Sequence, residues 1–272
     1  MTGFRYAVSA AEVAPVTAPL PLTGKIEDII STAAELGYNG IELHTREDVP
    51  FDYDNINLWL SQQNVKLVNI VTGRINTEGN LSLLDADGGA KCLDGLKKYV
   101  NMAAKFGADI VLGWAKGKIS CEDKRDEELC LLAKNLRELA EYAGNKDVKV
   151  NVELINRYET NIFNTADEFL SFMQKYDIPN CYAHIDTFHM NIEEGDVPAA
   201  IKKLGKYLGY VHIADNQRHY PGSGSLDFEE LLMVLKDVGY EGFINVECLP
   251  IPGRIEAARS AIDHMKMIER KI

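Results

Sequence analysis

Apolar residues recur along the chain in two alternating patterns. Short continuous apolar runs predict buried strands, and apolar residues spaced three and four positions apart predict amphipathic helices between them. The clearest helical stripe consists of Leu129, Leu132, Leu136, Leu139, Ala140 and Ala143. Two further helices are predicted to begin at Asn164–Thr165 and at Asp227, because Asn, Thr and Asp are favoured N-cap residues. The chain therefore reads as a series of strand–helix units.

Eight such units are predicted over the 272 residues. The strands are expected at 6–9, 41–44, 66–71, 109–114, 148–153, 182–186, 210–215 and 243–249. They are too apolar for a sheet with one face in water and suit a parallel sheet covered by helices. Eight regular units without a GxGxxG motif favour an α/β (β/α)8 TIM barrel over an open sheet. Because no linker interrupts the chain, we expect a single domain over residues 1–272.

The charge balance narrows the classes of partner. Acidic residues outnumber basic ones, and the formal net charge is −12. This argues against nucleic acid, whose binding needs clustered Lys and Arg, and against an anionic membrane surface. Five scattered cysteines without a CxxC pair indicate reduced thiols. With no signal-peptide pattern at the start and no apolar segment long enough to span a membrane, we expect a cytoplasmic protein.

Four ionisable residues lie at or near the ends of consecutive predicted strands. They are Glu153, Asp186, His212 and Glu247. In a barrel the carboxyl ends of all strands converge on one face, so these side chains should meet. Taken singly, an acidic residue after a strand is commonly a helix cap or a solvated loop acid. The matched positions on four successive strands favour a shared site.

Three carboxylates this close would repel one another and bind protons unless a cation neutralised them. A divalent ion would do so, with Asp186 and His212 holding it. The oxygen-rich donor set favours Mn²⁺, then Co²⁺ or Mg²⁺, over Zn²⁺. Such an ion acidifies the proton next to a bound carbonyl and stabilises the enediolate. Glu153 and Glu247, one on each side of that carbon, would remove and return the proton.

Several segments resemble the ketose 3-epimerases, the D-tagatose/D-psicose 3-epimerase branch of the xylose isomerase-like TIM barrels. The segments are 156–160, 186–194, 212–218, 221–222 and 246–250. Within that branch they are most similar to the 5-keto-L-gluconate epimerases. The resemblance implies a metal-dependent isomerase that epimerises C3 of a ketose or keto-sugar acid through a cis-enediolate. It also implies a homodimer or homotetramer.

The resemblance further assigns roles to single residues. The implied metal ligands are Glu153, Asp186, His212 and Glu247, with the two Glu also as the acid/base pair. The implied substrate contacts are Glu159, His189 and Arg218 at the carbonyl end of the sugar, and Trp114 as an apolar wall. Each substrate contact has a plainer interpretation from the residues alone, as a solvated acid, a salt-bridge partner or core.

The segment after the first strand departs from the family. Sugar 3-epimerases have aromatic residues there, whereas this chain has the Ala- and Pro-rich stretch 11–21. That loop should touch the far end of the substrate. Four basic residues after strands two, three and four, Arg46, Arg74, Lys116 and Lys118, could receive a carboxylate and favour a keto-sugar acid. Alternatively they are solvated surface charges.

Other functions stay open at this point. The same enediolate could expel a group β to the carbonyl, as in a C-glycoside deglycosidase-type lyase acting on a 3-keto sugar. A hydroxypyruvate-type aldose–ketose isomerase would use the same chemistry. A barrel endonuclease with three zinc ions would need many histidines, whereas the chain has six. A sugar-binding barrel without catalysis is the non-enzymatic alternative.

Overall fold

The computed structural model describes residues 3–85 and 88–272. The strands are β1 (Arg5–Ala11), β2 (Leu22–Thr23), β3 (Gly40–His44), β4 (Lys66–Val71), β5 (Asp109–Leu112), β6 (Val150–Glu153), β7 (Cys181–Asp186), β8 (Leu208–Ile213) and β9 (Phe243–Val246). The α-helices are α1 (Ile26–Leu36), α2 (Tyr53–Gln63), α3 (Arg74–Thr77), α4 (Gly89–Ala104), α5 (Arg125–Gly144), α6 (Ala166–Tyr176), α7 (Thr187–Glu193), α8 (Val197–Leu204), α9 (Phe228–Asp237) and α10 (Arg254–Glu269). Short 3-10 helices are η1 (Trp114–Lys116), η2 (Glu122–Lys124) and η3 (Gly205–Tyr207).

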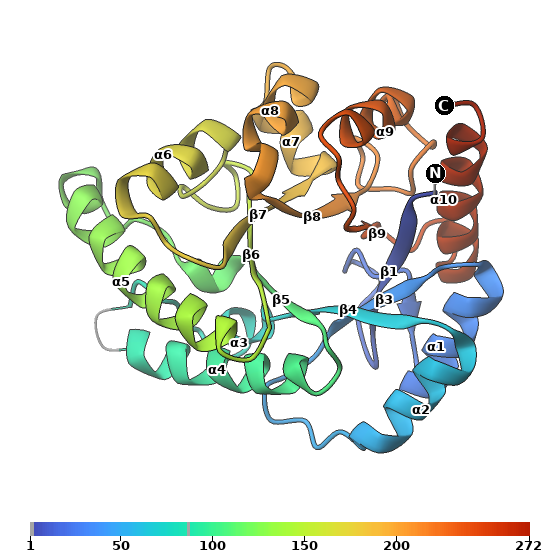
Figure 1. Ribbon diagram of the computed structural model, residues 1–272, viewed down its shortest axis with the longest axis horizontal. Coiled ribbons are helices and arrows are strands. Elements are labelled where there is room, and N and C mark those ends of the chain that lie inside the picture. Colours follow the sequence, from blue (N-terminus) through green and yellow to red (C-terminus); the bar gives the residue numbers. More distant parts are fainter. Residues whose placement is uncertain (1–2, 86–87) are drawn as a thin grey trace.

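The strands form one parallel sheet in the order β2-β1-β3-β4-β5-β6-β7-β8-β9. Because β1 also pairs with β9, β1 and β3–β9 close into a barrel, and the two-residue β2 pairs with β1 outside the ring. The helices surround the strands (Figure 1). The predicted single-domain (β/α)8 TIM barrel is confirmed.

The helix signals in the sequence act as predicted. Thr165 accepts a hydrogen bond from the backbone N of Glu168 at 3.2 Å, and Asp227 accepts one from the N of Glu230 at 2.9 Å. Along α5, the predicted stripe includes Leu132, Leu136 and Leu139, all fully buried. Burying each such Leu stabilises the fold by about 1.5–3 kcal/mol, so truncating one to Ala would cost about 2–5 kcal/mol.

From the sequence, the polar residues after the strand 182–186 predict a loop. This prediction is wrong, because the segment forms the short helix α7. Asp186 begins it, because its Oδ1 accepts a hydrogen bond from the N of Phe188 at 2.8 Å. Met190 then turns into the core. The capping role that a single Asp suggests and the shared-site role are therefore compatible, since the second carboxylate oxygen of Asp186 is left for other partners.

The barrel interior is polar, unlike the branched apolar filling that dominates most TIM barrels. Asn151 on β6 donates to Asn69 on β4 at 3.2 Å, although β5 lies between these strands, so the contact crosses the inside of the barrel. His212 on β8 and Glu42 on β3 also meet across it, at 2.9 Å. The strands predicted as simply apolar thus carry a buried polar lining.

Two further features of the described residues bear on the predictions. They include no helix that is both long and apolar enough to cross a membrane. All five cysteines are free. Burial raises the pKa of the Cys92 thiol to about 12 and also raises that of Cys181, so these thiols are protonated and unreactive at neutral pH.

Candidate active site

The four residues predicted to share a site do lie together. Glu153 and Asp186 end β6 and β7, His212 is near the end of β8, and Glu247 directly follows β9. Asp186 pairs with His212, whereas Glu153 pairs with His184, two residues before Asp186, and His212 pairs with Asn245, two residues before Glu247. A shift of two residues keeps a side chain on the same face of the sheet. One ligand atom from each of the four residues lies within 4.8 Å of those from the other three. The parallel barrel thus converts matched strand ends into one cluster.

Glu42 fixes the orientation of His212. The Nε2 of His212 lies 2.9 Å from Glu42 Oε2, and the other oxygen of Glu42 accepts from Ser9 Oγ at 2.8 Å and Asn245 Nδ2 at 3.2 Å. The opposite nitrogen, Nδ1, faces Asp186 and Glu247, 3.8 and 3.5 Å from their nearest oxygens. A histidine held by a carboxylate through one nitrogen commonly presents the other to a metal ion.

The cluster fits a divalent metal ion. His212 Nδ1 is buried and makes no hydrogen bond to the described residues. Asp186 Oδ2 is also buried, and it forms an ion pair with Arg218 but no hydrogen bond of good geometry. Burial opposes protonation of His212, yet Glu42 and Glu247 raise its pKa well above the usual value, so the cluster attracts positive charge. Three carboxylates and one imidazole suit a hard to borderline ion. This donor set, which the sequence predicted as a metal site, suggests a divalent metal.

The two glutamates have opposite proton affinities. Burial, reinforced by the charge of Glu247, raises the pKa of Glu153 to about 8. Burial also acts against ionisation of Glu247, but Arg218 and His212 lower its pKa to about 2. One carboxyl group is thus protonated and the other ionised at neutral pH in the metal-free protein. Pairs of acidic residues whose pKa values differ this widely are typical of acid/base catalysis.

Arg218 lies against this cluster. Its Nη1 is 2.7 Å from Asp186 Oδ2, and its Nη2 donates to Glu247 Oε2. The guanidinium also covers the ring of Phe188, 4.8 Å from the centroid. Arg218 has a left-handed backbone with φ of 63°, a conformation that costs free energy for a non-glycine residue and clusters at functional sites. Arg218, predicted as a substrate contact, thus lies within the site and contacts two of the candidate metal ligands.

His189 and Glu159 are held by Asn156. Its Nδ2 lies 2.7 Å from His189 Nδ1 and 3.0 Å from Glu159 Oε1. Because the amide donates, the ring proton of His189 lies on Nε2, which is 3.6 Å from Glu153 Oε1. Burial lowers the pKa of His189 to about 4, so the ring is neutral. Trp114 donates from Nε1 to Glu159 Oε2 at 3.1 Å.

These residues surround a cavity of about 530 Å³ above the cluster. Its lining includes all the predicted substrate contacts, Glu159, His189, Arg218 and Trp114. Asp186 and His212 lie beneath it and are almost fully buried. The cavity thus reaches the reactive pair Glu153 and Glu247 from above, and Trp114, 43% exposed, forms part of its wall rather than core.

The Ala- and Pro-rich loop also lines the cavity, through residues between Ala14 and Leu20. Of the four basic residues considered as carboxylate receptors, Arg74 is the one that lines the cavity. Its guanidinium donates to Glu78 at 2.7 Å and to the Val13 carbonyl at 2.9 Å. Arg46 pairs with the same Glu78. Lys116 is fully buried below the surface, and Lys118 does not line the cavity. Only Arg74 is therefore placed to meet a ligand there.

Comparison with known proteins now identifies the family. Residues 30–268 match the xylose isomerase-like TIM barrel family. The chain belongs to this family. An L-ribulose 3-epimerase of Mesorhizobium japonicum is 30% identical over 225 residues, 82% of this chain and 75% of that protein. Another, of Methylomonas sp., is 43% identical over 112 residues, 41% of this chain and only 39% of that protein.

The fold extends this similarity over the whole barrel. The crystal structure of a D-allulose 3-epimerase from Methylomonas sp. in complex with D-allulose has a TM-score of 0.81 and 25% identity, covering 98% of both chains. The family's ketose 3-epimerase homologues are isomerase-class sugar epimerases. The predicted family and the predicted enzyme class, a sugar epimerase of this superfamily, are thus confirmed.

Sequence reasoning missed two residues in this family member's site. Glu42 is fully buried behind His212, and His44 Nε2 lies 3.3 Å from Glu42 Oε1 and 3.4 Å from Glu247 Oε1. Both belong to the predicted strand 41–44, where they alternate with Ile41 and Leu43. Ionisable residues at every second position of a short strand would have indicated a polar inner face.

Proposed function

We propose that the protein is a metal-dependent epimerase that inverts C3 of a ketose or keto-sugar acid through a cis-enediolate. The observation that carries the proposal is the convergence of Glu153, Asp186, His212 and Glu247 within 4.8 Å beneath a cavity of sugar-binding size. The names of the homologues support the same reaction class. A cytoplasmic location and a homodimer or homotetramer remain predictions from the sequence.

The metal would be held by Glu153, Asp186, His212 and Glu247, with His212 offering Nδ1. Mn²⁺ is the first choice, then Co²⁺ or Mg²⁺, because oxygen donors outnumber nitrogen. When bound, the ion supplies a Lewis acid that polarises the sugar carbonyl and so acidifies the neighbouring C–H. Glu42 keeps Nδ1 of His212 available by holding Nε2.

Glu153 and Glu247 carry the proton transfers. One carboxylate takes the C3 proton, and the electron pair of the broken C–H bond moves into the carbonyl to give the enediolate. The second glutamate, which is protonated at that stage, returns a proton to the opposite face of C3 and so inverts that centre. The two residues exchange roles in the reverse direction. Their opposed pKa values, about 8 and about 2 in the metal-free protein, support one acid and one base.

The substrate contacts follow from the hydrogen bonds already described. His189 is neutral and presents Nε2–H, so it can donate to an oxygen that gains negative charge without giving up its proton. Arg218 offers guanidinium donors, and Glu159, fixed by Trp114 and Asn156, accepts from a sugar hydroxyl. The exposed face of the Trp114 ring covers the carbon skeleton.

NMR in D₂O tests the proposal. The metal-loaded protein, with Mn²⁺ added, would be incubated with D-fructose, D-tagatose, D-psicose, 5-keto-gluconate and tagaturonate. We expect deuterium at the carbon next to the carbonyl (C3 of a 2-ketose) in at least one compound, together with its epimer at that carbon. Turnover of a keto acid in preference to the neutral ketoses would assign Arg74 to its carboxylate. A protein that binds Mn²⁺ yet exchanges no proton in any of them would contradict the proposal, and release of an aglycone from a 3-keto glycoside would replace it with the lyase.

A further inference from the structure

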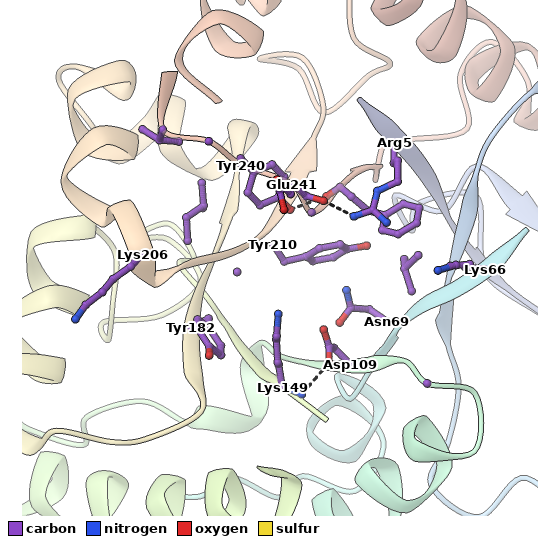
Figure 2. Close-up of a pocket in the computed structure, with 18 of the residues that line it drawn as sticks. Arg5, Lys66, Asn69, Asp109, Lys149, Tyr182, Lys206, Tyr210, Tyr240 and Glu241 are labelled. Atoms are coloured by element: carbon purple, nitrogen blue, oxygen red, sulfur yellow. Dashed lines mark hydrogen bonds between the residues drawn. The ribbon is translucent and has the colours of Figure 1, made fainter. Parts of the chain in front are cut away.

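A second cavity lies at the opposite end of the barrel from the candidate metal ligands. Its volume is about 830 Å³, and it shares no lining residue with the upper cavity. Its walls come from the beginnings of strands: Arg5 is the first residue of β1, Lys66 of β4 and Asp109 of β5, and Lys149 directly precedes β6 (Figure 2). Because all strands are parallel, these residues surround one mouth, the lower mouth of the barrel.

Basic side chains without ion pairs gather in this cavity. Arg5, Lys66, Lys149 and Lys206 line it, and none of them lies within 4.0 Å of a carboxylate among residues 3–85 and 88–272. Two acids, Asp109 and Glu241, also line the cavity, so the four cations outnumber them by two. This is unexpected in a chain with 41 acidic and 29 basic residues. Unpaired cations collected in a concave site indicate a place for an anion.

Aromatic rings hold two of these cations in position. The Arg5 guanidinium lies 4.5 Å from the centroid of the Phe243 ring and donates to the carbonyl of Glu241. The ammonium of Lys149 lies 5.5 Å from the centroid of the Tyr182 ring. Cation–π contacts of this kind restrict the side chains without neutralising their charge. The remaining donors of Arg5 and Lys149 stay available to a ligand.

The floor of the cavity carries a buried hydroxyl with no partner. Tyr210 is 2% exposed, and its hydroxyl makes no hydrogen bond to the described residues. In Figure 2 this hydroxyl is directed toward the side of the cavity formed by Arg5, Lys66 and Asn69. Asn69 and Glu42 lie near this hydroxyl, but neither contact has the geometry of a hydrogen bond. Buried polar groups are nearly always hydrogen-bonded, so a ligand oxygen at this side of the cavity would supply a partner that the described residues do not.

We propose that the lower mouth binds a small metabolite through a phosphate or carboxylate group. Arg5, Lys66 and Lys149 neutralise the anion, and the Tyr210 hydroxyl and Asn69 amide donate to its oxygens. The volume is within the 300–1,000 Å³ usual for small-ligand sites, and the rings of Tyr182, Tyr240 and Phe243 suit the carbon skeleton. This site is separate from the proposed epimerase centre and does not depend on it.

Calorimetric titration of the metal-free 272-residue protein tests the site. Inorganic phosphate, D-glucose 6-phosphate and D-gluconate would be added at low ionic strength, with D-glucose as the neutral reference. We expect saturable binding of one equivalent of at least one anion. The phosphate and gluconate titrations show which anionic group is preferred. Chelating the metal beforehand prevents an anion from binding through it.

Matched variants locate the binding. Lys66→Gln and Lys149→Gln change exposed side chains and should weaken binding about tenfold, the effect of losing a hydrogen bond to a charged group. Lys91→Gln removes the same charge from an exposed position on α4 outside the cavity and should leave the affinity unchanged. Tyr210→Phe, which removes only the hydroxyl, should weaken binding as well.

Three results would overturn the proposal. They are the absence of saturable binding by all three anions, an equal loss of affinity in Lys91→Gln, and a loss in Arg74→Gln with none in Lys66→Gln. The last would move the anion to the upper cavity, where Arg74 lies. Circular dichroism of each variant confirms that the fold is retained.

Discussion

The two mouths of the barrel carry opposite charges, although the same strands supply both. At the upper mouth the strands end in Glu153 and Asp186, and Glu247 follows β9. At the lower mouth β1 and β4 begin with Arg5 and Lys66, although β5 begins with Asp109. On β8, Tyr210 faces the lower cavity while His212, two residues later, joins the candidate metal ligands. Acids therefore predominate at the upper mouth, and basic residues outnumber acids at the lower one.

This contrast shows how a strongly acidic protein can offer sites of both signs. The net charge of −12 describes the whole chain, but each mouth is governed by the few residues at one end of the strands. The upper acids need a cation, and their burial makes that need stronger. The lower cations are more exposed, so an anion there would be held more weakly and with a stronger dependence on salt.

The largest effect is expected when the acid/base pair is removed. Glu153→Gln and Glu247→Gln each replace a carboxyl group with an amide that can neither take nor give a proton. Epimerisation should fall by at least about 10²-fold, the usual contribution of general acid–base catalysis. Glu35→Gln, an exposed position on α1, is the control. Full activity in either variant, measured by rates of C3 inversion, would remove that residue from the mechanism.

Glu42 should act on the metal without touching it. Glu42→Gln removes the charge that fixes His212 while keeping a similar shape. We expect metal affinity to fall about 10- to 100-fold, as for other carboxylates that support a ligating histidine. Mn²⁺ titration followed by electron paramagnetic resonance measures this directly. An unchanged affinity would show that His212 does not depend on Glu42, and a soluble, folded variant is required for either conclusion.

The raised pKa of Glu153 predicts how stability depends on pH. Its carboxyl group ionises near pH 4.5 when unfolded but only near pH 8 in the metal-free folded protein. The folded state therefore binds the extra proton between these values, and this group's contribution to stability falls as pH rises through that window. Glu153→Gln has no buried carboxyl group to ionise, so its stability relative to wild type should increase from pH 4.5 to 8, by a few kcal/mol at most.

Denaturant unfolding of both proteins at several pH values measures this difference. Saturating Mn²⁺ should reduce it, because a cation would favour the ionised carboxylate. A difference in stability that does not vary with pH in the metal-free proteins would contradict the assignment of the raised pKa to Glu153.

The smallest effect is expected at the rim of the upper cavity. Trp114→Phe keeps an aromatic wall but loses the hydrogen bond to Glu159. We expect KM to rise by about twofold to tenfold with little change in kcat, the cost of one ordinary hydrogen bond. Trp59→Phe, which changes the same residue type on α2 away from the cavity, should leave KM unchanged. Equal effects of both variants would indicate a general change in stability.

The grouping of residues at the upper mouth was predictable because the same pattern, an ionisable residue at the end of a strand, occurs four times. Glu153, Asp186, His212 and Glu247 occupy equivalent positions on four strands, and barrel closure brings such positions together. Their roles as ligands remain a proposal, but their proximity needed only the fold. The helix after Asp186 was missed because the same side chain both caps it and faces the site.

Contacts across the barrel were not predictable in the same way. Glu42 and His212 are 170 positions apart and meet only because the β1–β9 pairing closes the barrel, which leaves just two strands between β3 and β8. The lower mouth was missed for a related reason. Arg5, Lys66 and Lys149 are single basic residues far apart in the chain, and each alone is typical of a solvated surface charge. Their shared position depends on the closed barrel rather than on any local motif.

The most direct test of the central claim, two glutamates acting on opposite faces of one carbon, is hydrogen exchange by the single variants. Each of two C3 epimers that the wild type interconverts would be incubated separately in D₂O with Mn²⁺-loaded Glu153→Gln or Glu247→Gln. We predict that each variant exchanges the C3 proton of only one epimer, without inversion, and that the two variants prefer opposite epimers. Exchange of the same epimer by both variants, or undiminished inversion by either, would contradict the two-base account.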